Sequence, residues 1–415
     1  MVSISLALGI AAVGCSSGGS GSIANLTPPM HGAAGQRAAG QPAKSRSASW
    51  PEFGFIPSGG RFNPHERTLS PHNAHRLHKL WSFFTGCSGS LCGGSSATVA
   101  DGIVYAGSYD GNVYAVDAAT GAKVWSFLTG GEVFSTPAVA NGVVYAGSND
   151  RNLYALDAKT GTKLWSYTTG YDVTTSPAVV DGVVYIGSED GSVYAIKAAT
   201  GAKLWSYATG LVVDSSPAVA NGTVYFGSDD GNVYALNAAT GAKLWSYATQ
   251  SEVYSSPAVA NGVVYVGSED SNVYALKAAT GAKLWSYTTG DLVNSSPAVA
   301  NGVVYVGSID DNVYALNATT GAKLWSFTTG NIVLSSPGLA NHVVYVGSED
   351  GNFYALNAAT GSKLWSYHTA DQVFSSPTVT GGVVYAGSAD GNLYAFGEEG
   401  KQPRERTTTQ PGPLR

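Results

Sequence analysis

Charge is scarce in this sequence of 415 residues, because Asp, Glu, Lys and Arg make up 12% of it, about half the usual fraction. The net charge of −6 speaks against a nucleic-acid-binding protein, which needs a basic surface. Met occurs twice and Cys three times, and no apolar run is long enough to span a bilayer as a helix. Gly (53), Tyr (24) and Trp (9) are abundant instead. This profile excludes a disordered chain, a coiled coil, a collagen and a polytopic membrane protein, and it fits an all-β protein with many tight turns.

Residues 1–15 resemble a bacterial lipoprotein signal peptide. A short apolar stretch ends in Ala12-Val13-Gly14, and Cys15 follows as the residue to be lipidated. Two departures keep an ordinary secretory signal and a cytoplasmic protein open as alternatives: the start lacks Lys and Arg, and Ala12 stands where Leu is usual. We expect residues 16–49, rich in Gly, Ser and Ala, to be a flexible tether. The expected location is extracytoplasmic, anchored to the membrane through a lipid, or otherwise secreted.

The remaining Cys and a run of His could suggest metal binding. Cys87 and Cys92 form a close, even pair in a Gly/Ser-rich stretch, and in an exported protein we expect a disulfide there. Its small ring would contribute about 2 kcal/mol. His72, His75 and His78 occur every third residue, but no carboxylate or Cys stands at ligand spacing beside them. We therefore interpret them as solvated positions and assign no metal ligands.

From residue 101 onward the sequence repeats itself every 40 residues. Residues 221–260 and 261–300, for example, differ at ten of their 40 positions. Each unit contains four short segments rich in Val, Tyr and Trp, separated by Asn-Gly, Asp-Gly and Thr-Gly turn signals. A four-stranded unit of this length is typical of a β-propeller blade. One unit cannot bury both faces of its sheet, so the units must stack around an axis.

The two ends of the array fix the number of blades. The last copy stops before its Trp strand, and an isolated Trp strand around Trp81 precedes the first copy. The sequence therefore predicts an all-β, eight-bladed propeller of four-stranded blades over residues 78–397, closed by the N-terminal Trp81 strand joining the last blade. Closure removes an exposed sheet edge. We expect residues 50–77 to be a leader that packs on the propeller, and residues 398–415 to be a disordered tail.

The segment 235–245, with the sequence ALNAATGAKLW, resembles the tryptophan-docking motif of quinoprotein-like propellers, and the resemblance covers all eight units. It implies that one Trp per blade docks between neighbouring blades. These residues are Trp81, Trp125, Trp165, Trp205, Trp245, Trp285, Trp325 and Trp365. The leader, with Trp50-Pro51-Glu52-Phe53-Gly54, is also similar to the leaders of these proteins. The class contains dehydrogenases with pyrroloquinoline quinone and Ca²⁺ on the axis, and non-catalytic BamB-type envelope lipoproteins that bind partners.

Several features favour the non-catalytic type. The dehydrogenases typically cover the quinone with a vicinal Cys pair, and this chain has no adjacent Cys residues. The Ser-Pro segments expected around the axis are nearly the same in every unit, which argues against an asymmetric pocket. Asp110-Gly111-Asn112 and its copies offer too few carboxylates for Ca²⁺, and a type I′ hairpin turn accounts for them. We expect no cofactor and no catalytic residue; a quinone- and Ca²⁺-dependent alcohol or sugar dehydrogenase is the alternative.

Differences between the units indicate where a partner would bind. They gather in two connections that share one face of a propeller, and these connections hold 19 of the 28 acidic residues, while the recurring Lys lies in a turn on the opposite face. We expect an acidic face that docks a basic or extended envelope protein or peptide on a monomeric propeller; neutral drift in a recently amplified array is the competing interpretation. The candidate residues are Glu132, Phe134, Tyr171, Asp172, Leu211, Asp214, Glu252, Tyr254, Leu292, Ile332, Leu334 and Phe374.

Overall fold

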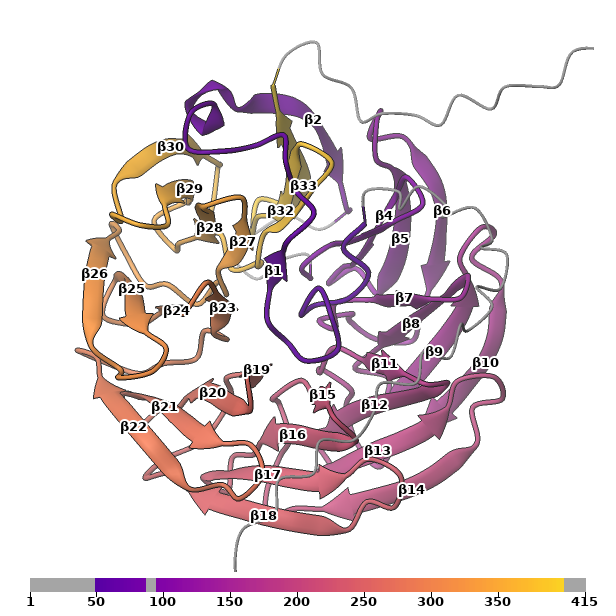
Figure 1. The fold of residues 1–415 in the computed structure, drawn as a ribbon. Helices are drawn as coiled ribbons and strands as arrows, with labels where there is room; N and C mark the ends of the chain where they lie inside the picture. Colours follow the sequence, from indigo (N-terminus) through magenta and orange to yellow (C-terminus); the bar gives the residue numbers. More distant parts are fainter. Residues whose placement is uncertain (1–48, 87–94, 399–415) are drawn as a thin grey trace, which may run out of the picture. The chain divides into compact units, whose positions relative to one another are not determined.

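The computed structural model describes residues 49–86 and 95–398. The signal peptide with Cys15, nearly all of the tether, the pair Cys87 and Cys92, and all but the first residue of the tail lie outside these residues. Within the described part, the strands form eight sheets arranged as a ring around a central axis, as predicted (Figure 1). Four strands of each sheet form an antiparallel meander that runs from the axis outward, and each such set is called a blade here.

The blades are numbered in chain order. Blade 1 contains β3 (Thr98–Ala100), β4 (Ile103–Gly107), β5 (Asn112–Asp117) and β6 (Lys123–Leu128); blade 2 contains β7 (Ala138–Ala140), β8 (Val143–Gly147), β9 (Asn152–Asp157) and β10 (Lys163–Thr168); blade 3 contains β11 (Ala178–Val180), β12 (Val183–Ser188), β13 (Ser192–Lys197) and β14 (Lys203–Ala208); blade 4 contains β15 (Ala218–Ala220), β16 (Thr223–Gly227), β17 (Asn232–Asn237) and β18 (Lys243–Ala248). Blade 5 contains β19 (Ala258–Ala260), β20 (Val263–Gly267), β21 (Asn272–Lys277) and β22 (Lys283–Thr288); blade 6 contains β23 (Ala298–Ala300), β24 (Val303–Gly307), β25 (Asn312–Asn317) and β26 (Lys323–Thr328); blade 7 contains β27 (Gly338–Ala340), β28 (Val343–Gly347), β29 (Asn352–Asn357) and β30 (Lys363–His368).

Blade 8 joins the two ends of the propeller. It contains β31 (Thr378–Thr380), β32 (Val383–Gly387) and β33 (Asn392–Gly397), and its outermost strand is β2 (His78–Phe84). β2 is antiparallel to β33, with Trp81 opposite Ala395. The predicted closure by the Trp81 strand is therefore confirmed.

Two kinds of hairpin turn separate the strands. In the Asn-Gly turns both residues have positive φ, 52° at Asn141 and 78° at Gly142, as a type I′ turn requires. In the Asp-Gly turns between the second and third strands only the second residue does, as at Gly111 with φ 84°, whereas Asp181-Gly182, between the first and second strands, has positive φ at both residues. The type I′ prediction for Asp110-Gly111 was therefore wrong. The Asp remains in the ordinary region because its side chain accepts the N–H two residues later, forming an Asx turn.

Hydrophobic clusters lie between neighbouring blades. One cluster, for example, joins Tyr265, Val273 and Trp285 of blade 5 to Val304 and Leu316 of blade 6. Each blade thus buries one face of its sheet against the next blade, which is why a single unit cannot fold alone.

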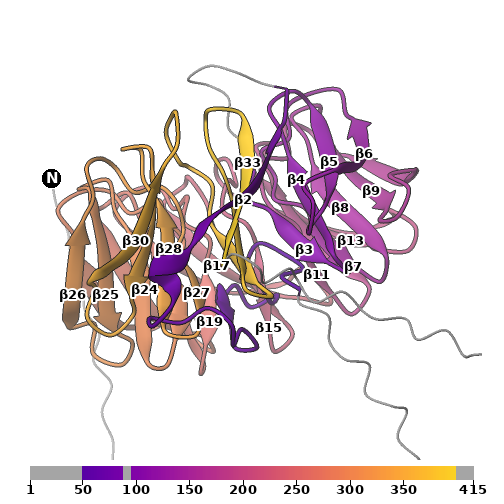
Figure 2. The ribbon, with the colours of Figure 1, turned by 90° about the horizontal axis from the view of Figure 1, so that it is seen from above.

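The leader runs across the centre of the ring (Figures 1 and 2). It contains a two-residue strand, β1 (Phe62–Asn63), and a 3-10 helix, η1 (Ala74–Arg76). β1 pairs in parallel with β27 and gives blade 7 a fifth strand, which the sequence did not predict. The leader residues Trp50, Phe55, Leu69 and Leu77 join the hydrophobic cluster between blades 7 and 8.

Candidate binding site at the channel mouth

The meander places the repeated and the varying parts of each unit at opposite ends of the strands. The turns between the first and second strands and between the third and fourth strands lie at one end, called the constant face here. The turns between the second and third strands, such as 148–151, and the connections from one blade to the next, such as 169–177, lie at the other end, called the variable face. The N–H of Asn149 donates to the carbonyl of Glu132 at 2.9 Å, so the two variable connections lie side by side.

The Trp side chains hold neighbouring blades together. In seven of the eight copies, the indole Nε1 donates to the carbonyl of an Ala in the next blade at 2.8–3.1 Å, as Trp245 does to Ala278. A Tyr hydroxyl, here that of Tyr225, donates to the same carbonyl. The eighth Trp, Trp365, packs edge-on against Phe396 at 5.1 Å between ring centroids.

Eight of the acidic residues on the variable face have a structural role. Asp150 and its copies accept a hydrogen bond from a Tyr hydroxyl four residues later, at 2.5–2.6 Å in all eight units. Asp150 also accepts the N–H of Gly130 in the preceding connection. Burial opposes its ionisation, but the bonds from Tyr154, Gly130 and Asn152 together lower its pKa. This leaves 11 of the 19 acidic residues for any binding role.

Serine side chains line the channel along the axis. The N–H of Ser176 donates to Oγ of Ser216 in the next blade, and seven such bonds of 2.8–3.0 Å run around the ring. The first Ser of each Ser-Ser-Pro segment adds bonds such as that from Ser215 Oγ to the carbonyl of Ser255 at 3.0 Å. These small side chains form a collar that is held by hydrogen bonds between neighbouring blades, although the buried Ser135 Oγ has no partner.

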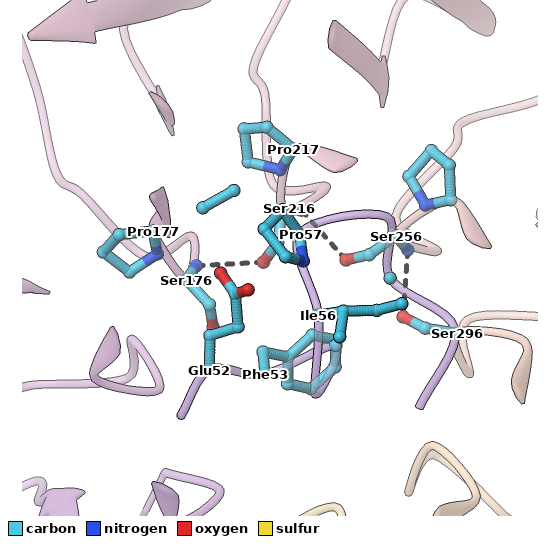
Figure 3. Close-up of a pocket in the computed structure, with 14 residues that line it drawn as sticks. Glu52, Phe53, Ile56, Pro57, Ser176, Pro177, Ser216, Pro217, Ser256 and Ser296 are labelled. Carbon is cyan, nitrogen blue, oxygen red and sulfur yellow. Dashed lines mark hydrogen bonds between the residues drawn. The ribbon is translucent and has the colours of Figure 1, made fainter. Parts of the chain in front are cut away.

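The leader fills the channel at its constant-face end. In seven blades, the N–H of the middle residue of the innermost strand donates to the leader. Six of these bonds reach backbone carbonyls at 2.7–3.0 Å, such as those of Trp50, Pro57 and Arg61, and the seventh reaches the carboxyl group of Glu52 at 3.4 Å. Figure 3 shows the leader residues Glu52, Phe53, Ile56 and Pro57 against the serine collar. The cavity left between them is about 20 Å³, room for about one water molecule.

Three charged side chains of the leader are buried: Glu52, Arg61 and Glu66. Burial raises the pKa of Glu52 to about 8, and the bond from the N–H of Val179 offsets only part of the shift. Arg61 donates from Nε and Nη2 to the carbonyls of Pro337 and Pro377, each at 3.0 Å, and from Nη1 to that of Phe53 at 2.6 Å. Burial lowers the Arg61 pKa to about 9. Arg61 therefore clips the leader to blades 7 and 8.

The space between the leader and the collar does not fit a quinone and its cation. A planar quinone needs far more room than the cavity above the leader offers, and the collar around it consists of Ser and Pro rather than of oxygen-rich acidic ligands. Among the described residues, no group of three or more His, Cys, Asp or Glu could hold a metal ion. His72 and His75 are exposed, and His78 begins β2.

The channel mouth on the variable face is asymmetric. Around it stand seven pairs of described positions, each a residue of a turn and a residue leading into the next blade, and the turn residue Ala389. Four neighbouring pairs form an acidic arc: Asn149 and Thr174, Glu189 and Asp214, Asp229 and Tyr254, and Glu269 and Asn294. On the other side, an apolar arc contains the pairs Tyr109 with Phe134 and Ile309 with Leu334. It also contains Ala389 and Phe374, although the pair partner of Phe374 is the acidic Glu349.

Direct contacts hold several of these pairs in place. Thr174 Oγ1 donates to Asp214 Oδ1 at 2.8 Å across two blades, directly above the serine collar. Asn294 Nδ2 donates to Glu269 Oε1 at 3.1 Å. On the apolar arc, Tyr109 and Phe134 pack edge to face with centroids 4.3 Å apart. The residues at the mouth therefore form a connected surface.

The acidic arc concentrates negative charge. Burial raises the pKa of Asp229 to about 6, the charge of Asp214 raises it further, and Glu252 and Glu269 add to this, while Tyr254 lowers it. Burial also raises the pKa of Asp214 and of Glu189, the latter with help from the charges of Asp214 and Asp172. Mutual repulsion thus makes these carboxylates a favourable place for a positive charge.

The residues predicted from unit-to-unit differences are divided between this mouth and the outer part of the variable face. Phe134, Asp214, Tyr254, Leu334 and Phe374 belong to the mouth. Tyr171 and Leu211 are about half exposed further out, and the remaining candidates, Glu132, Asp172, Glu252, Leu292 and Ile332, lie beside them in the same connections. That they bind a partner stays a prediction.

The sequence analysis missed the turn residues of the mouth as candidates, above all Glu189, Asp229 and Glu269. Their position also differs from unit to unit, so the same signal could have identified them. Their pairing with residues of the next blade could not be read from the repeat, because the two positions are 25 residues apart.

Comparisons with known proteins agree with this architecture. The family described as outer membrane protein assembly factor BamB matches residues 68–211, 189–297 and 288–412, and the chain belongs to this family. No curated protein matches the sequence.

Solved structures share the fold at low identity. BamB from Moraxella catarrhalis is 22% identical with a TM-score of 0.67, covering 78% of this chain and 98% of that one. Quinohemoprotein alcohol dehydrogenase from Comamonas testosteroni is 18% identical with a TM-score of 0.74, covering 88% and 82%. The computationally designed Ika8 protein is 21% identical with a TM-score of 0.69, covering 77% and 99%. The neighbours thus include an assembly factor, an enzyme and a designed protein. Among the described residues, no helix is long and apolar enough to cross a membrane.

Proposed function

We propose that this protein is a non-catalytic binding propeller of the bacterial cell envelope, which holds a protein or peptide partner on its variable face. The observation that carries the proposal is the contrast between the two faces. The constant face, the collar and the docking Trp residues repeat almost without change, whereas the variable face brings unlike residues together into an acidic arc and a largely apolar arc. Drift alone gives no reason for acidic and apolar residues to sort into separate sectors.

Membership of the BamB family supports an envelope location and a role in binding other proteins. The lipoprotein-type start of the sequence with Cys15 would tether the propeller to a membrane through residues 16–49. The filled channel and the Ser-Pro collar support a binding role over quinone chemistry.

Photo-cross-linking from the two faces tests the proposal. A photoreactive Phe derivative replaces Tyr171 or Leu211 on the variable face, or the exposed Ala239 on the constant face as a matched control. In cells that produce the chain naturally, we expect a discrete cross-linked envelope protein from Tyr171 and Leu211 and none from Ala239. Equal cross-linking from both faces would contradict the assignment.

A titration with pyrroloquinoline quinone and Ca²⁺, together with a dye-linked alcohol oxidation assay, tests the dehydrogenase alternative. We expect neither heat of binding nor turnover. Tight one-to-one binding with turnover would overturn the non-catalytic assignment.

A further inference from the structure

Oxygen atoms without hydrogen-bond donors gather in the acidic arc. Oδ1 of Asn149, Oδ1 of Asp229 and Oδ1 of Asn294 are buried, and none of them has a hydrogen-bond partner. All three are acceptors, and they belong to three of the four pairs in this arc. Buried acceptors of this kind are rare in folded proteins, because an unmade hydrogen bond is costly. The arc therefore contains acceptors whose hydrogen bonds the protein's own donors leave unmade.

Positive charge is missing from the same place. In the two variable connections of all eight units, Arg151 is the single Lys or Arg. It lies over the ring of Tyr171, 5.5 Å from the centroid, on the outer part of the face. Asp214, Asp229 and Glu269 therefore have no cationic partner in the protein's own variable connections.

The arrangement of oxygen acceptors in the acidic arc favours a nitrogen cation over a metal ion. No group of His, Cys, Asp or Glu among the described residues meets the requirements of a metal site. Amide oxygens and spaced carboxylates accept hydrogen bonds from several N–H groups at once, as a guanidinium or an ammonium provides.

The apolar arc indicates that the ligand carries an apolar group beside its cation. Phe134 is 38% exposed, and Leu334 and Phe374 are partly exposed. In the order of the blades, Phe134 directly precedes the acidic arc and Leu334 directly follows it, so a ligand that extends along the ring can touch both arcs. Aromatic and aliphatic anchors beside a charge-complementary surface are typical of peptide recognition.

We propose that the channel mouth binds an extended peptide segment in which a Lys or Arg stands close to a large apolar residue, the cation on the acidic arc and the apolar side chain on the apolar arc. This inference rests on the proposed function and names the chemistry of its partner.

Other blades supply the substitutions that test the mouth without disturbing the fold. Asp214→Asn and Asp229→Asn introduce residues already present at the equivalent positions, Asn294 and Asn149. Phe374→Thr copies Thr174 at the same position of blade 3. The matched control, Asp181→Asn, removes one acidic charge from an Asn-Gly-type turn of the constant face, where Asn is found in most copies.

Isothermal titration calorimetry of the full chain uses the capped peptide Gly-Ser-Lys-Phe-Arg-Leu-Ser-Gly as its probe. Two further peptides replace its basic residues with Glu, or its apolar residues with Ser. We expect one-to-one binding of the first peptide alone, weaker at high salt. The double variant Asp214→Asn/Asp229→Asn should weaken binding roughly tenfold or more, and Phe374→Thr should weaken it less. Asp181→Asn should leave it unchanged.

Three outcomes would overturn the inference: no binding of the basic-apolar peptide, equal binding of the Glu-containing peptide, or unchanged affinity in the double variant. The cross-linking experiment separates this failure from that of the proposed function. If Tyr171 still cross-links a discrete partner while the mouth variants have no effect, the variable face binds by other residues and only the peptide inference fails. Circular dichroism of each variant verifies that the repeat-derived substitutions leave the fold intact.

Discussion

At the scale of the residue, the acidic side chains of this propeller divide into two kinds that look alike in the sequence. Asp310 accepts the hydroxyl of Tyr314 and the N–H of Gly290 and of Asn312. Other acidic residues on the same face lack such a network. The carboxylate of Asp291, for example, accepts the N–H of the next residue, Leu292. Composition alone therefore overstates how much of the charge is available for binding.

We expect Asp310→Ala to lower the free energy of unfolding by about 2 kcal/mol or more, because three donors lose a charged acceptor. Asp291→Ala, the control on the same face, should change it by less than about 0.5 kcal/mol, as is usual for exposed sites. Urea unfolding followed by Trp fluorescence measures both. Equal effects of the two substitutions would contradict the structural role of the repeated Asp.

The raised pKa of Glu52 predicts the sign of a pH dependence of the protein's stability. Its pKa is 4.5 in the unfolded chain and about 8 when folded, so between these values the folded protein binds the extra proton. Stability is therefore lost as the pH rises from about 5 to about 8, by up to about 1.4 kcal/mol per pH unit from this group. Glu52→Gln keeps an acceptor for the N–H of Val179 and removes the ionisation.

The Gln variant should match the wild type near pH 5 and exceed it in stability at pH 8.5. Thermal unfolding over this pH range measures the difference between the two proteins. Glu132→Gln, an exposed substitution on the variable face, serves as the control and should leave the pH profile unchanged. A Gln variant that is less stable than the wild type at pH 8.5 would show that Glu52 is ionised inside the plug.

At the scale of the element, the outermost strand of each blade is tied to the next blade by a shared acceptor. The carbonyl of Ala278 receives Trp245 Nε1 at 2.8 Å and the Tyr225 hydroxyl at 3.3 Å. When one donor is removed, the other still satisfies the carbonyl of Ala278. The double variant should therefore lose more stability than the two single variants together.

We expect Trp245→Phe and Tyr225→Phe each to cost about 1 kcal/mol, and the double variant about 1 kcal/mol more than their sum, because it leaves the carbonyl unpaired. A double-mutant cycle in urea, with the same pair of changes at Trp285 and Tyr265 as a replicate, measures the coupling. Strict additivity would indicate that water replaces the missing donors.

The strands and the blade closure could be predicted from the sequence, because the sequence repeats. Turn signals at fixed spacing define four strands per unit, and the isolated Trp81 strand requires a partner at the other end. The leader is different. Trp50, Arg61 and Asn63 meet strands up to 316 residues away, and no periodicity encodes such contacts. Phe134, Leu334 and Phe374 of the apolar arc were among the residues predicted to bind a partner, which stays a prediction. The sorting of acidic and apolar pairs into arcs depends on the order of blades around the axis.

At the scale of the whole molecule, the leader matches a ring of eight blades. It accepts N–H groups from seven innermost strands in turn, and Asn63 Nδ2 donates to the carbonyl of Val379 in the last blade at 2.9 Å. A ring with one blade fewer would be narrower and would present these groups at other angles. The leader therefore favours a ring of eight blades. The blades are nearly identical and do not fix their own number.

Removing residues 221–260 tests this condition, because it joins Ala220 to Asn261 and recreates the junction that Ala260 and Asn261 already form. We expect the shortened chain to lose the seated leader and about 3–5 kcal/mol or more of stability, since Trp50 and Arg61 lose their buried sites. Replacing residues 221–260 with a copy of 261–300 keeps eight blades and should keep the leader in place. Hydrogen exchange of residues 50–63, with thermal unfolding, distinguishes the two chains. Slow exchange of the leader in the seven-bladed chain would show that the plug adapts to the ring and does not select its size.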